Sequence, residues 1–432
     1  MSRDLGAGMA ALARAVKADS FQMASLSASA RNGALGAIAE ALVRHSDAIF
    51  AANDADLAAG AQSGLPDPIM KRLRFDAGKL RDAAAGVRDL ISLPDPLFRT
   101  LLHRELDAGL VLRQVSCPIG VIGVIFESRP DALIQIAALC LKSGNCTILK
   151  GGSEAARTNK VLFDLIFEAG VGAGLPEGFL TLAETRADIN ELLVCHESID
   201  LLIPRGSNEF VRYIMDRSSI PVMGHADGVC HIYADESVDV EKAVPIIRDA
   251  KIQYAAACNA VETLLVHRSA AAALLPPVFA DLRACGVTVK GCAETRRIIP
   301  DAAPASEADF ATEYLDYIIS VKIVESLDDA VAHINTYGSH HTDAILTEDD
   351  AVAERFMLLV DSAGVYRNCS TRFADGFRYG FGAEVGISTG KLHARGPVGL
   401  SGLVTYKYKL CGDGQIVGDY AEGRRSFHFK DL

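Results

Sequence analysis

The sequence predicts an α/β protein with two doubly wound α/β domains and a small additional β element. Three observations support this prediction. From residue 120 onward, short apolar runs alternate with segments of helical periodicity, which is typical of parallel sheets covered by helices. A second alternating set begins near residue 238. Two β-like runs, 104–117 and 403–411, stand apart from both sets and predict the additional element.

The first hundred residues have the periodicity of helices. Apolar side chains recur at spacings of three and four, as at Leu35, Ile38 and Leu42, which places them on one helix face. In the alternating set that follows, we expect strands at 121–126, 146–149, 179–183 and 199–203. We expect helices at 131–141, 153–168 and 187–195 and another that Ser207 caps.

The second alternating set follows the same pattern. We expect strands at 263–267, 287–290, 317–324 and 343–347. We expect helices at 238–254, 327–337 and 351–360 and another that ends at Arg283. Strands separated by helices of this length form parallel sheets through right-handed crossovers.

Composition limits the classes of function. The 432 residues are 50% apolar and 23% charged, with a net charge of -12, which is typical of a globular protein. A diffuse negative charge argues against nonspecific nucleic-acid binding, which needs a basic surface. The longest nearly apolar stretch, 132–141, is too short to span a membrane. The ten cysteines include no C-x-x-C pair, so we expect reduced thiols in a cytoplasmic protein.

Two turns are suited to binding anions. Lys150–Ser153 and Pro204–Ser207 each follow a predicted parallel strand and precede a helix, and each contains a basic residue. Ligands of open α/β sheets bind at the carboxyl ends of strands, and helix N-termini attract phosphate. The pair of turns therefore predicts a phosphorylated ligand. Neither turn matches the usual dinucleotide-binding fingerprint, so a dinucleotide would bind there in an atypical way.

Cys258 is a candidate nucleophile. It lies among small residues in a predicted loop between a long helix and a strand, and a thiolate there can attack an acyl carbon. From these residues alone, a buried structural cysteine is the favoured interpretation. His340 and His341 are adjacent on a predicted strand, where neighbouring side chains point to opposite faces. We therefore interpret them as polar residues at the start of that strand and expect no metal.

Several longer segments together resemble the gamma-glutamyl phosphate reductase family, a branch of the aldehyde dehydrogenase superfamily. The resemblance covers about residues 20–420. Its most specific segments are 118–130 (PIGVIGVIFESRP), 141–145 (LKSGN), 150–155 (KGGSEA), 258–263 (CNAVET), 370–376 (STRFADG), 382–389 (GAEVGIST) and 393–397 (HARGP).

The resemblance implies an aldehyde-dehydrogenase-like fold and a reaction of L-proline biosynthesis. In that reaction NADPH reduces L-glutamyl 5-phosphate to L-glutamate 5-semialdehyde with release of phosphate. Cys258 matches the catalytic cysteine of the family, whose thiolate forms a thioester. Ser128 stands where the superfamily has an oxyanion-binding asparagine. The segment 223–227 lacks the glutamate that activates water in hydrolytic relatives. This absence agrees with a reaction in which phosphate, and not water, is the partner of the thioester.

The resemblance also implies roles for individual residues. The implied catalytic residues are Cys258, Asn259 and Ser128. The implied NADP(H)-binding residues are Lys150, Gly151, Gly152, Ser153, Glu154, Pro204, Arg205, Gly206, Ser207 and Glu313. The candidates for binding the acyl phosphate or the glutamate carboxylate are Arg129, His225, Arg372 and Arg395, with Arg205 as a further candidate.

The family's domain plan assigns each part of the chain. It implies an NADP(H)-binding domain from 1–103 and 118–228, a catalytic domain from 229–400, and an oligomerisation element from 104–117 and 401–432. Because an exposed sheet edge is normally paired, we expect a dimer or a larger homo-oligomer. A separate glutamate kinase must supply the acyl phosphate, so a transient kinase contact is a further expectation.

Two alternative functions remain open at this point. One is an acyl-CoA reductase of the same superfamily, which would share Cys258 and both phosphate turns. The segments 370–376 and 386–389 argue against it. The other is a non-catalytic homologue. The family usually has a proline shortly before the cysteine, whereas this chain has Tyr254-Ala255-Ala256-Ala257, and the absence of proline frees the backbone there.

Overall fold

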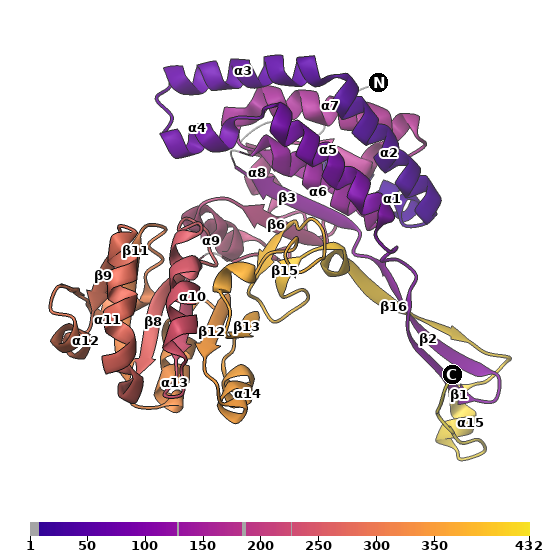
Figure 1. Cartoon of the computed structure of the whole chain (residues 1–432). Coiled ribbons are helices and arrows are strands. Elements are labelled where there is room, and N and C mark those ends of the chain that lie inside the picture. The colour runs from indigo at the N-terminus through magenta and orange to yellow at the C-terminus, as the bar shows by residue number, and fades with distance from the viewer. Residues whose placement is uncertain (1–7, 128, 184–186, 226) are drawn as a thin grey trace.

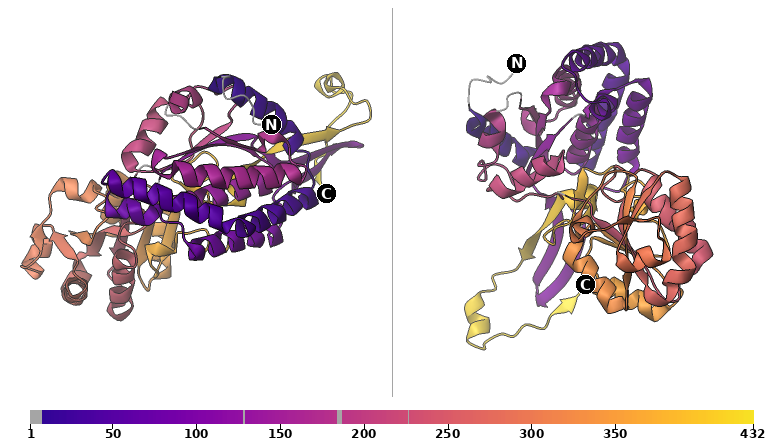
Figure 2. Two further views of the ribbon diagram at one scale, coloured as in Figure 1. Left: turned by 90° about the horizontal axis from the view of Figure 1, so that it is seen from above. Right: turned by 90° about the vertical axis from the view of Figure 1, so that its left-hand side faces the viewer.

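The computed structural model describes residues 8–127, 129–183, 187–225 and 227–432. The chain forms an N-terminal α/β domain, a second α/β domain and a projecting β arm (Figure 1). Figure 2 shows that the arm and the second domain extend from the same side of the N-terminal domain. This arrangement confirms the predicted fold class.

The N-terminal domain is built on a parallel sheet with the strand order β5-β4-β3-β6. Its strands are β3 (Val121–Phe126), β4 (Cys146–Gly151), β5 (Leu180–Leu182) and β6 (Leu201–Arg205). Its α-helices are α1 (Met9–Met23), α2 (Ala28–Arg44), α3 (Ser46–Gln62), α4 (Asp67–Leu73), α5 (Ala77–Ser92), α6 (Pro130–Lys142), α7 (Ala156–Gly172), α8 (Ala187–Leu192) and α9 (Asn208–Arg217). Every residue of β3 is buried, as expected for a strand covered by helices on both faces.

The second domain contains a larger parallel sheet with the order β10-β9-β11-β8-β7-β12-β13. Its strands are β7 (Cys230–Ala234), β8 (Val261–His267), β9 (Thr288–Gly291), β10 (Ala303–Pro304), β11 (Ile318–Val324), β12 (Thr342–Leu346) and β13 (Gly364–Arg367). Its α-helices are α10 (Val240–Ile252), α11 (Arg268–Ala284), α12 (Ala293–Ile298), α13 (Leu327–Tyr337) and α14 (Asp350–Leu359). The strands β7, β10 and β13 were not predicted from the sequence.

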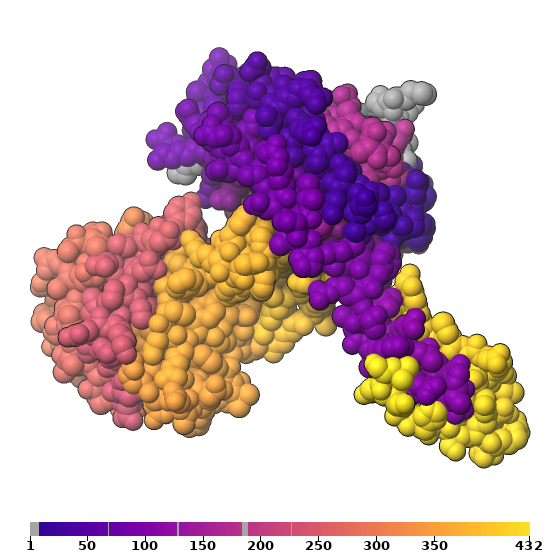
Figure 3. Space-filling model, turned by 45° about the vertical axis from the view of Figure 1, so that its right-hand side comes forward, coloured from indigo at the N-terminus to yellow at the C-terminus, as the bar shows by residue number. Residues whose placement is uncertain are grey.

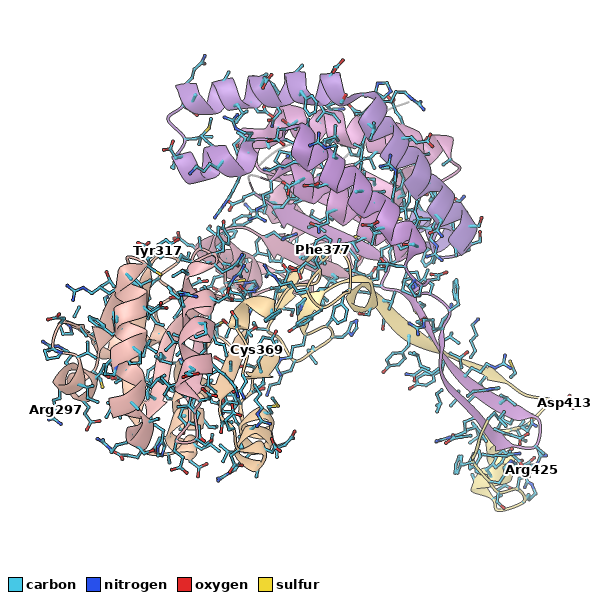
Figure 4. All side chains as sticks on the ribbon, in the orientation of Figure 1. Arg297, Tyr317, Cys369, Phe377, Asp413 and Arg425 are labelled. Carbon is cyan, nitrogen blue, oxygen red and sulfur yellow. The ribbon has the colours of Figure 1, made fainter. Side chains whose placement is uncertain are left out.

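The arm is an antiparallel sheet with the order β16-β2-β1-β17. Its elements are β1 (Thr100–Asp107), β2 (Leu110–Pro118), β16 (Val404–Cys411), α15 (Val417–Ala421) and β17 (Lys430–Asp431). The space-filling view shows it as a separate projection (Figure 3), and Asp413 and Arg425 lie at its far end (Figure 4). The single β-like run expected at 104–117 is in fact a hairpin of two strands that begins at Thr100.

The segment 383–403, which precedes β16 of the arm, packs against the N-terminal domain. Ala383, Val385, Val398, Leu400 and Leu403 belong to the core of that domain, although the expected catalytic domain extended to residue 400. The segment includes the small sheet of β14 (Gly386–Ser388) and β15 (Gly396–Val398). Short 3-10 helices lie at η1 (Ser153–Ala155), η2 (Glu177–Phe179), η3 (Glu307–Ala311), η4 (Thr371–Phe373) and η5 (Leu400–Leu403).

Within the described ranges, no helix combines the length and the apolar composition that crossing a bilayer requires.

Candidate active site

The candidate site lies between the carboxyl end of the N-terminal parallel sheet and the amino end of the second parallel sheet. Arg205 ends β6 of the N-terminal domain, and Cys258 lies in the loop just before β8 begins in the second domain. Cys258 is near enough to Arg205 to contribute to the pKa of the guanidinium group. The carboxyl edge of one sheet therefore meets the amino edge of the other at Cys258.

Close backbone packing holds the loop that carries Cys258. A Cβ atom at Gly228 would lie 2.1 Å from the Cys258 carbonyl oxygen and 2.4 Å from its Cα, so only glycine fits there. The Cys230 thiol donates a hydrogen bond of 3.3 Å to the same carbonyl, and burial raises the pKa of Cys230 well above its ordinary value. Asn259 is buried and donates its side-chain amide to Ala374 O at 2.8 Å. Asn259 therefore anchors the loop to the segment after η4.

Two imidazoles lie beside the Cys258 thiol. One ligand atom from each of His225, Cys258 and His341 lies within 4.8 Å of those of the other two. Cys258 and His225 are half-buried, while His341 is 1% exposed. His225 Nδ1 lies 3.0 Å from Ile387 O. Because a carbonyl oxygen only accepts hydrogen bonds, Nδ1 carries the proton, and the lone pair of His225 is on Nε2.

His341 is the site residue that sequence reasoning missed. The expectation that adjacent side chains diverge is met, since His340 Nδ1 turns to Asp361 O at 2.6 Å. His341 reaches Cys258 and His225, which come from other segments of the chain. His341 immediately precedes β12, and Cys258 shortly precedes β8 of the same parallel sheet. This shared position at the amino end of the sheet was the available signal for a contact between them.

Two guanidinium groups add positive charge around the nucleophile. Burial lowers the pKa of Arg205, and Arg129 lowers it further, whereas Glu384, Asp131 and Cys258 act in the opposite direction. Burial likewise lowers the pKa of Arg372, and Cys258 again opposes the shift. Arg372 Nε donates to Gln253 Oε1 at 2.9 Å, which orients the guanidinium. Both arginines favour an anionic ligand beside Cys258.

Glu384 and Glu313 balance part of this positive charge. Burial raises the pKa of each carboxyl group, and His225 opposes the shift in both cases. Glu384 accepts a 2.9 Å hydrogen bond from the Gly376 amide. Glu313 accepts hydrogen bonds from the Asn208 side chain and the Gly228 amide. Glu313 therefore connects the first turn of α9 with the glycine that packs on Cys258.

A cavity of about 720 Å³ opens at the carboxyl ends of β3 and β4. This volume lies within the range of ordinary ligand sites. The predicted residues that line it are Lys150, Gly151, Gly152, Ser153 and Glu154. The remaining lining comes from Ile125, Phe126, Glu127, Ile189, Asn190, Phe210 and Tyr213.

Acidic side chains lie at both predicted anion turns. Ser207 occupies the position before α9, but its side chain makes no capping hydrogen bond among the described residues. Its amide instead donates to Glu127 Oε2 at 3.0 Å. A Cβ atom at Gly152 would lie 2.2 Å from the Glu154 carboxylate, which therefore covers that turn. An anionic ligand would have to displace both carboxylates or bind beside them.

The remaining predicted site residues differ in burial and in their contacts. Arg129 is exposed at the residue before α6, where its charge interacts with that of Arg205. Arg395 donates to Asp361 Oδ1 and to Asp361 O, both at 3.1 Å. Pro204 and Gly206 flank Arg205 at the end of β6. The predicted residue Ser128 lies outside the described residues.

The arrangement contains the groups that acyl transfer through sulfur requires. It has a half-buried thiol, neighbouring ring nitrogens that can accept its proton, and cations that can hold an anionic leaving group. Within the described chain, no hydrogen bond engages the Cys258 amide N–H, so this group can donate to an oxyanion.

Comparisons with known proteins agree with this chemistry. Residues 7–292 match the sequence profile described as the aldehyde dehydrogenase family. A gamma-glutamyl phosphate reductase from Acetivibrio thermocellus is 57% identical over 412 residues, which covers 95% of each chain. One from Pelotomaculum thermopropionicum is 58% identical over 421 residues, covering 98% of this chain and 97% of the relative.

A solved structure extends the similarity to three dimensions. The crystal structure of a gamma-glutamyl phosphate reductase from Thermotoga maritima superposes with a TM-score of 0.93 at 38% sequence identity. The match covers 95% of this chain and all of the other.

Proposed function

The chain belongs to the gamma-glutamyl phosphate reductases of the aldehyde dehydrogenase family, and on this basis we propose that it reduces L-glutamyl 5-phosphate to L-glutamate 5-semialdehyde. NADPH is the proposed reductant, phosphate is released, and the pathway is L-proline biosynthesis. The observation that carries the proposal is the half-buried Cys258 thiol, which has two imidazoles within 4.8 Å and two arginines that interact with its charge.

The first half of the reaction forms a thioester. His225 Nε2 accepts the thiol proton, because the hydrogen bond to Ile387 O leaves the lone pair on that atom. The Cys258 thiolate attacks the acyl carbon, a carbon–sulfur bond forms, and the bond to the phosphate oxygen breaks. Arg205 and Arg372 offset the negative charge of the leaving phosphate.

The second half releases the aldehyde. The nicotinamide cofactor, when bound, supplies a hydride to the thioester carbon. The Cys258 amide N–H stabilises the resulting oxyanion. The carbon–sulfur bond then breaks, and the imidazolium returns its proton to the thiolate. The reaction needs no protein base for water, since water does not take part. Asn259 acts as a positioning residue through its bond to Ala374.

The cavity beside Lys150 suits the cofactor. It opens at the carboxyl ends of the strands, the usual place for nucleotides in such sheets. We assign Lys150, Gly151, Gly152, Ser153 and Glu154 to the adenosine half, and Pro204, Arg205, Gly206, Ser207 and Glu313 to the phosphates and the nicotinamide half. Preference for NADPH over NADH is part of the proposal.

The experiment that tests the proposal runs the reaction in reverse. NADPH formation is followed from glutamate 5-semialdehyde and NADP, with phosphate, with coenzyme A or with neither. We expect turnover only with phosphate, none in Cys258→Ala, and wild-type turnover in Cys411→Ser, since Cys411 lies on the arm. Turnover that requires coenzyme A would favour an acyl-CoA reductase. Folded wild-type protein without turnover under any of these conditions would contradict the proposal.

The arm supports a homo-oligomer. Strand β16 is at the edge of its sheet, and Tyr406, Tyr408 and Leu410 along it are exposed. An exposed apolar edge is normally covered by another strand, and a second copy of the chain is the proposed partner. The ten free cysteines support a cytoplasmic location. A transient contact with a separate glutamate kinase is proposed only because the acyl phosphate is labile.

A further inference from the structure

We propose that Cys258, His225 and His341 form a binding site for one Zn²⁺ ion, which inhibits the enzyme by occupying its nucleophile. The three side chains come from separate segments of the chain, and their ligand atoms lie within 4.8 Å of one another. Metal binding follows from these side chains alone, and only the inhibition rests on the proposed function.

The set of donor atoms matches the chemistry of zinc. A thiolate and two imidazoles form a three-ligand site that leaves the fourth position to water. Neighbouring ligand atoms of a tetrahedral zinc ion lie about 3.5 Å apart, given the usual bond lengths. The three ligand atoms lie within 4.8 Å of one another. Rotation of the half-buried Cys258 and His225 side chains can bring them to the distance that zinc requires. Such soft ligands favour zinc over magnesium or calcium.

His341 provides an independent indication of a ligand. The residue is 1% exposed, and its Nε2 atom is buried without a hydrogen-bond partner among the described residues. Its Nδ1 atom is engaged by Thr342 Oγ1 at 2.9 Å. A buried ring nitrogen without a partner is costly, and coordination of a cation by Nε2 removes that cost.

The surroundings orient the ligands and limit the affinity. The bond between His225 Nδ1 and Ile387 O is the contact that orients a metal-binding histidine through its second nitrogen. Glu313 and Glu384 interact electrostatically with His225 and favour a cation. Arg205 and Arg372 oppose a cation, but the Cys258 thiolate cancels one of the two zinc charges.

The binding step involves no redox change. One Zn–S bond and two Zn–N bonds form, water molecules leave the ion, and the Cys258 proton is released to solvent. Removal of zinc by a chelator reverses each change. While zinc is bound, the sulfur lone pair is engaged and cannot attack the acyl phosphate.

The test uses the full-length, reduced, metal-free protein. Cadmium is titrated as a probe through the ultraviolet sulfur-to-cadmium absorption, and zinc affinity is measured by competition with a chromogenic chelator. The variants are Cys258→Ser, His341→Gln and His225→Gln, with Cys411→Ser as the matched cysteine control. Circular dichroism reports folding, and His225→Gln keeps the test valid if the buried His341→Gln change unfolds the protein.

We expect one tight zinc ion per chain in the wild type and in Cys411→Ser. Cys258→Ser should remove the cadmium–sulfur band, and each histidine variant should weaken zinc binding at least about tenfold. Unchanged affinity in both histidine variants, or a band that persists in Cys258→Ser, would overturn the site. Binding is measured without substrate. An inactive wild type that still binds zinc would therefore contradict the proposed function and leave the metal site supported.

Discussion

Lys251 Nζ lies 2.7 Å from Glu262 Oε2, and both side chains are fully buried. Lys251 is in the last turn of α10 and Glu262 is the second residue of β8, so the ion pair joins the two ends of the loop that carries Cys258. Burial raises the pKa of Glu262 to about 7, with Lys251 acting in the opposite direction. Burial also lowers the pKa of Lys251.

The first prediction concerns this ion pair. Glu262→Leu leaves Lys251 buried without its partner, and removing one partner of such a pair costs about 3–5 kcal/mol of unfolding free energy. The double variant Lys251→Met, Glu262→Leu removes both charges and should recover most of that loss. Urea unfolding of the three proteins measures the difference. A single variant as stable as the double variant would show that the two charges are not coupled.

The second prediction concerns Gly228. Gly228→Ala places a Cβ atom 2.1 Å from the Cys258 carbonyl oxygen, so the loop must move. Displacing a reacting group by about 1 Å costs roughly 100-fold in rate. We expect kcat/KM to fall by about that factor, together with a changed rate of Cys258 alkylation by iodoacetamide.

Gly36→Ala is the matched control for Gly228→Ala. Gly36 lies in α2, and nothing lies within 4 Å of an added Cβ atom there. Alanine in a helix is about 0.5–1 kcal/mol more stable than glycine, so this control should keep full activity and gain stability. Equal activity of the two variants would show that Gly228 does not hold the nucleophile loop.

Elements were predicted correctly where the apolar pattern of the segment itself identifies a helix or a strand. The run Val121–Phe126 is apolar and buried throughout, and its strand was predicted with its observed bounds. Strand β7 was missed because Cys230-His231-Ile232-Tyr233-Ala234 mixes polar and apolar residues, although the fold buries them all. The arm hairpin was predicted as one strand because its partly exposed residues show no buried run.

The candidate site was predictable only in part for the same reason. Cys258 was identified from its small neighbours and from the family resemblance. The only signal for His341 was its place before a predicted strand, and this did not reveal the contact with Cys258, which depends on how the segments come together after folding. Arg205 was assigned to a phosphate turn from its local motif. Its charge interacts with Cys258 because β6 is the edge strand of its sheet.

The third prediction concerns cofactor preference at the cavity beside Lys150. NADPH carries a ribose phosphate, which the Glu154 carboxylate at the Gly152 turn would repel. Glu154→Gln removes that charge and should raise the ratio of kcat/KM for NADPH to that for NADH by up to about fivefold. Steady-state kinetics with both cofactors measure the ratio.

Lys150→Met is the complementary change at this cavity. It removes a cation that lines the same space and should raise the KM for NADPH while leaving kcat within about twofold, because the side chain contributes binding in the ground state and the transition state alike. The assignment of the cavity to the adenosine half would be contradicted if both variants left the NADPH to NADH ratio and both KM values unchanged.

The fourth prediction concerns acid stability and His333. Burial, together with the neighbouring charges of His231 and Lys322, lowers the pKa of His333 from 6.5 to about 3. Below about pH 6.5, His333 therefore binds a proton in the unfolded chain but remains neutral in the folded chain. Stability that is fully present above pH 6.5 is lost as the pH falls toward 3, at about 1.4 kcal/mol per pH unit.

The measurement compares wild type with His333→Gln by urea unfolding at about pH 7.5 and pH 5. Glutamine does not titrate, so the wild type should lose about 2 kcal/mol more than the variant between the two conditions. The His231–Asp343 pair and the surface carboxylates are present in both proteins. Subtracting the stability change of the variant from that of the wild type therefore removes most of their contribution to the pH dependence. Parallel pH profiles would mean that His333 is protonated in the folded chain. Its ring would then have to leave the contacts with Phe310 and Tyr337 and reach water.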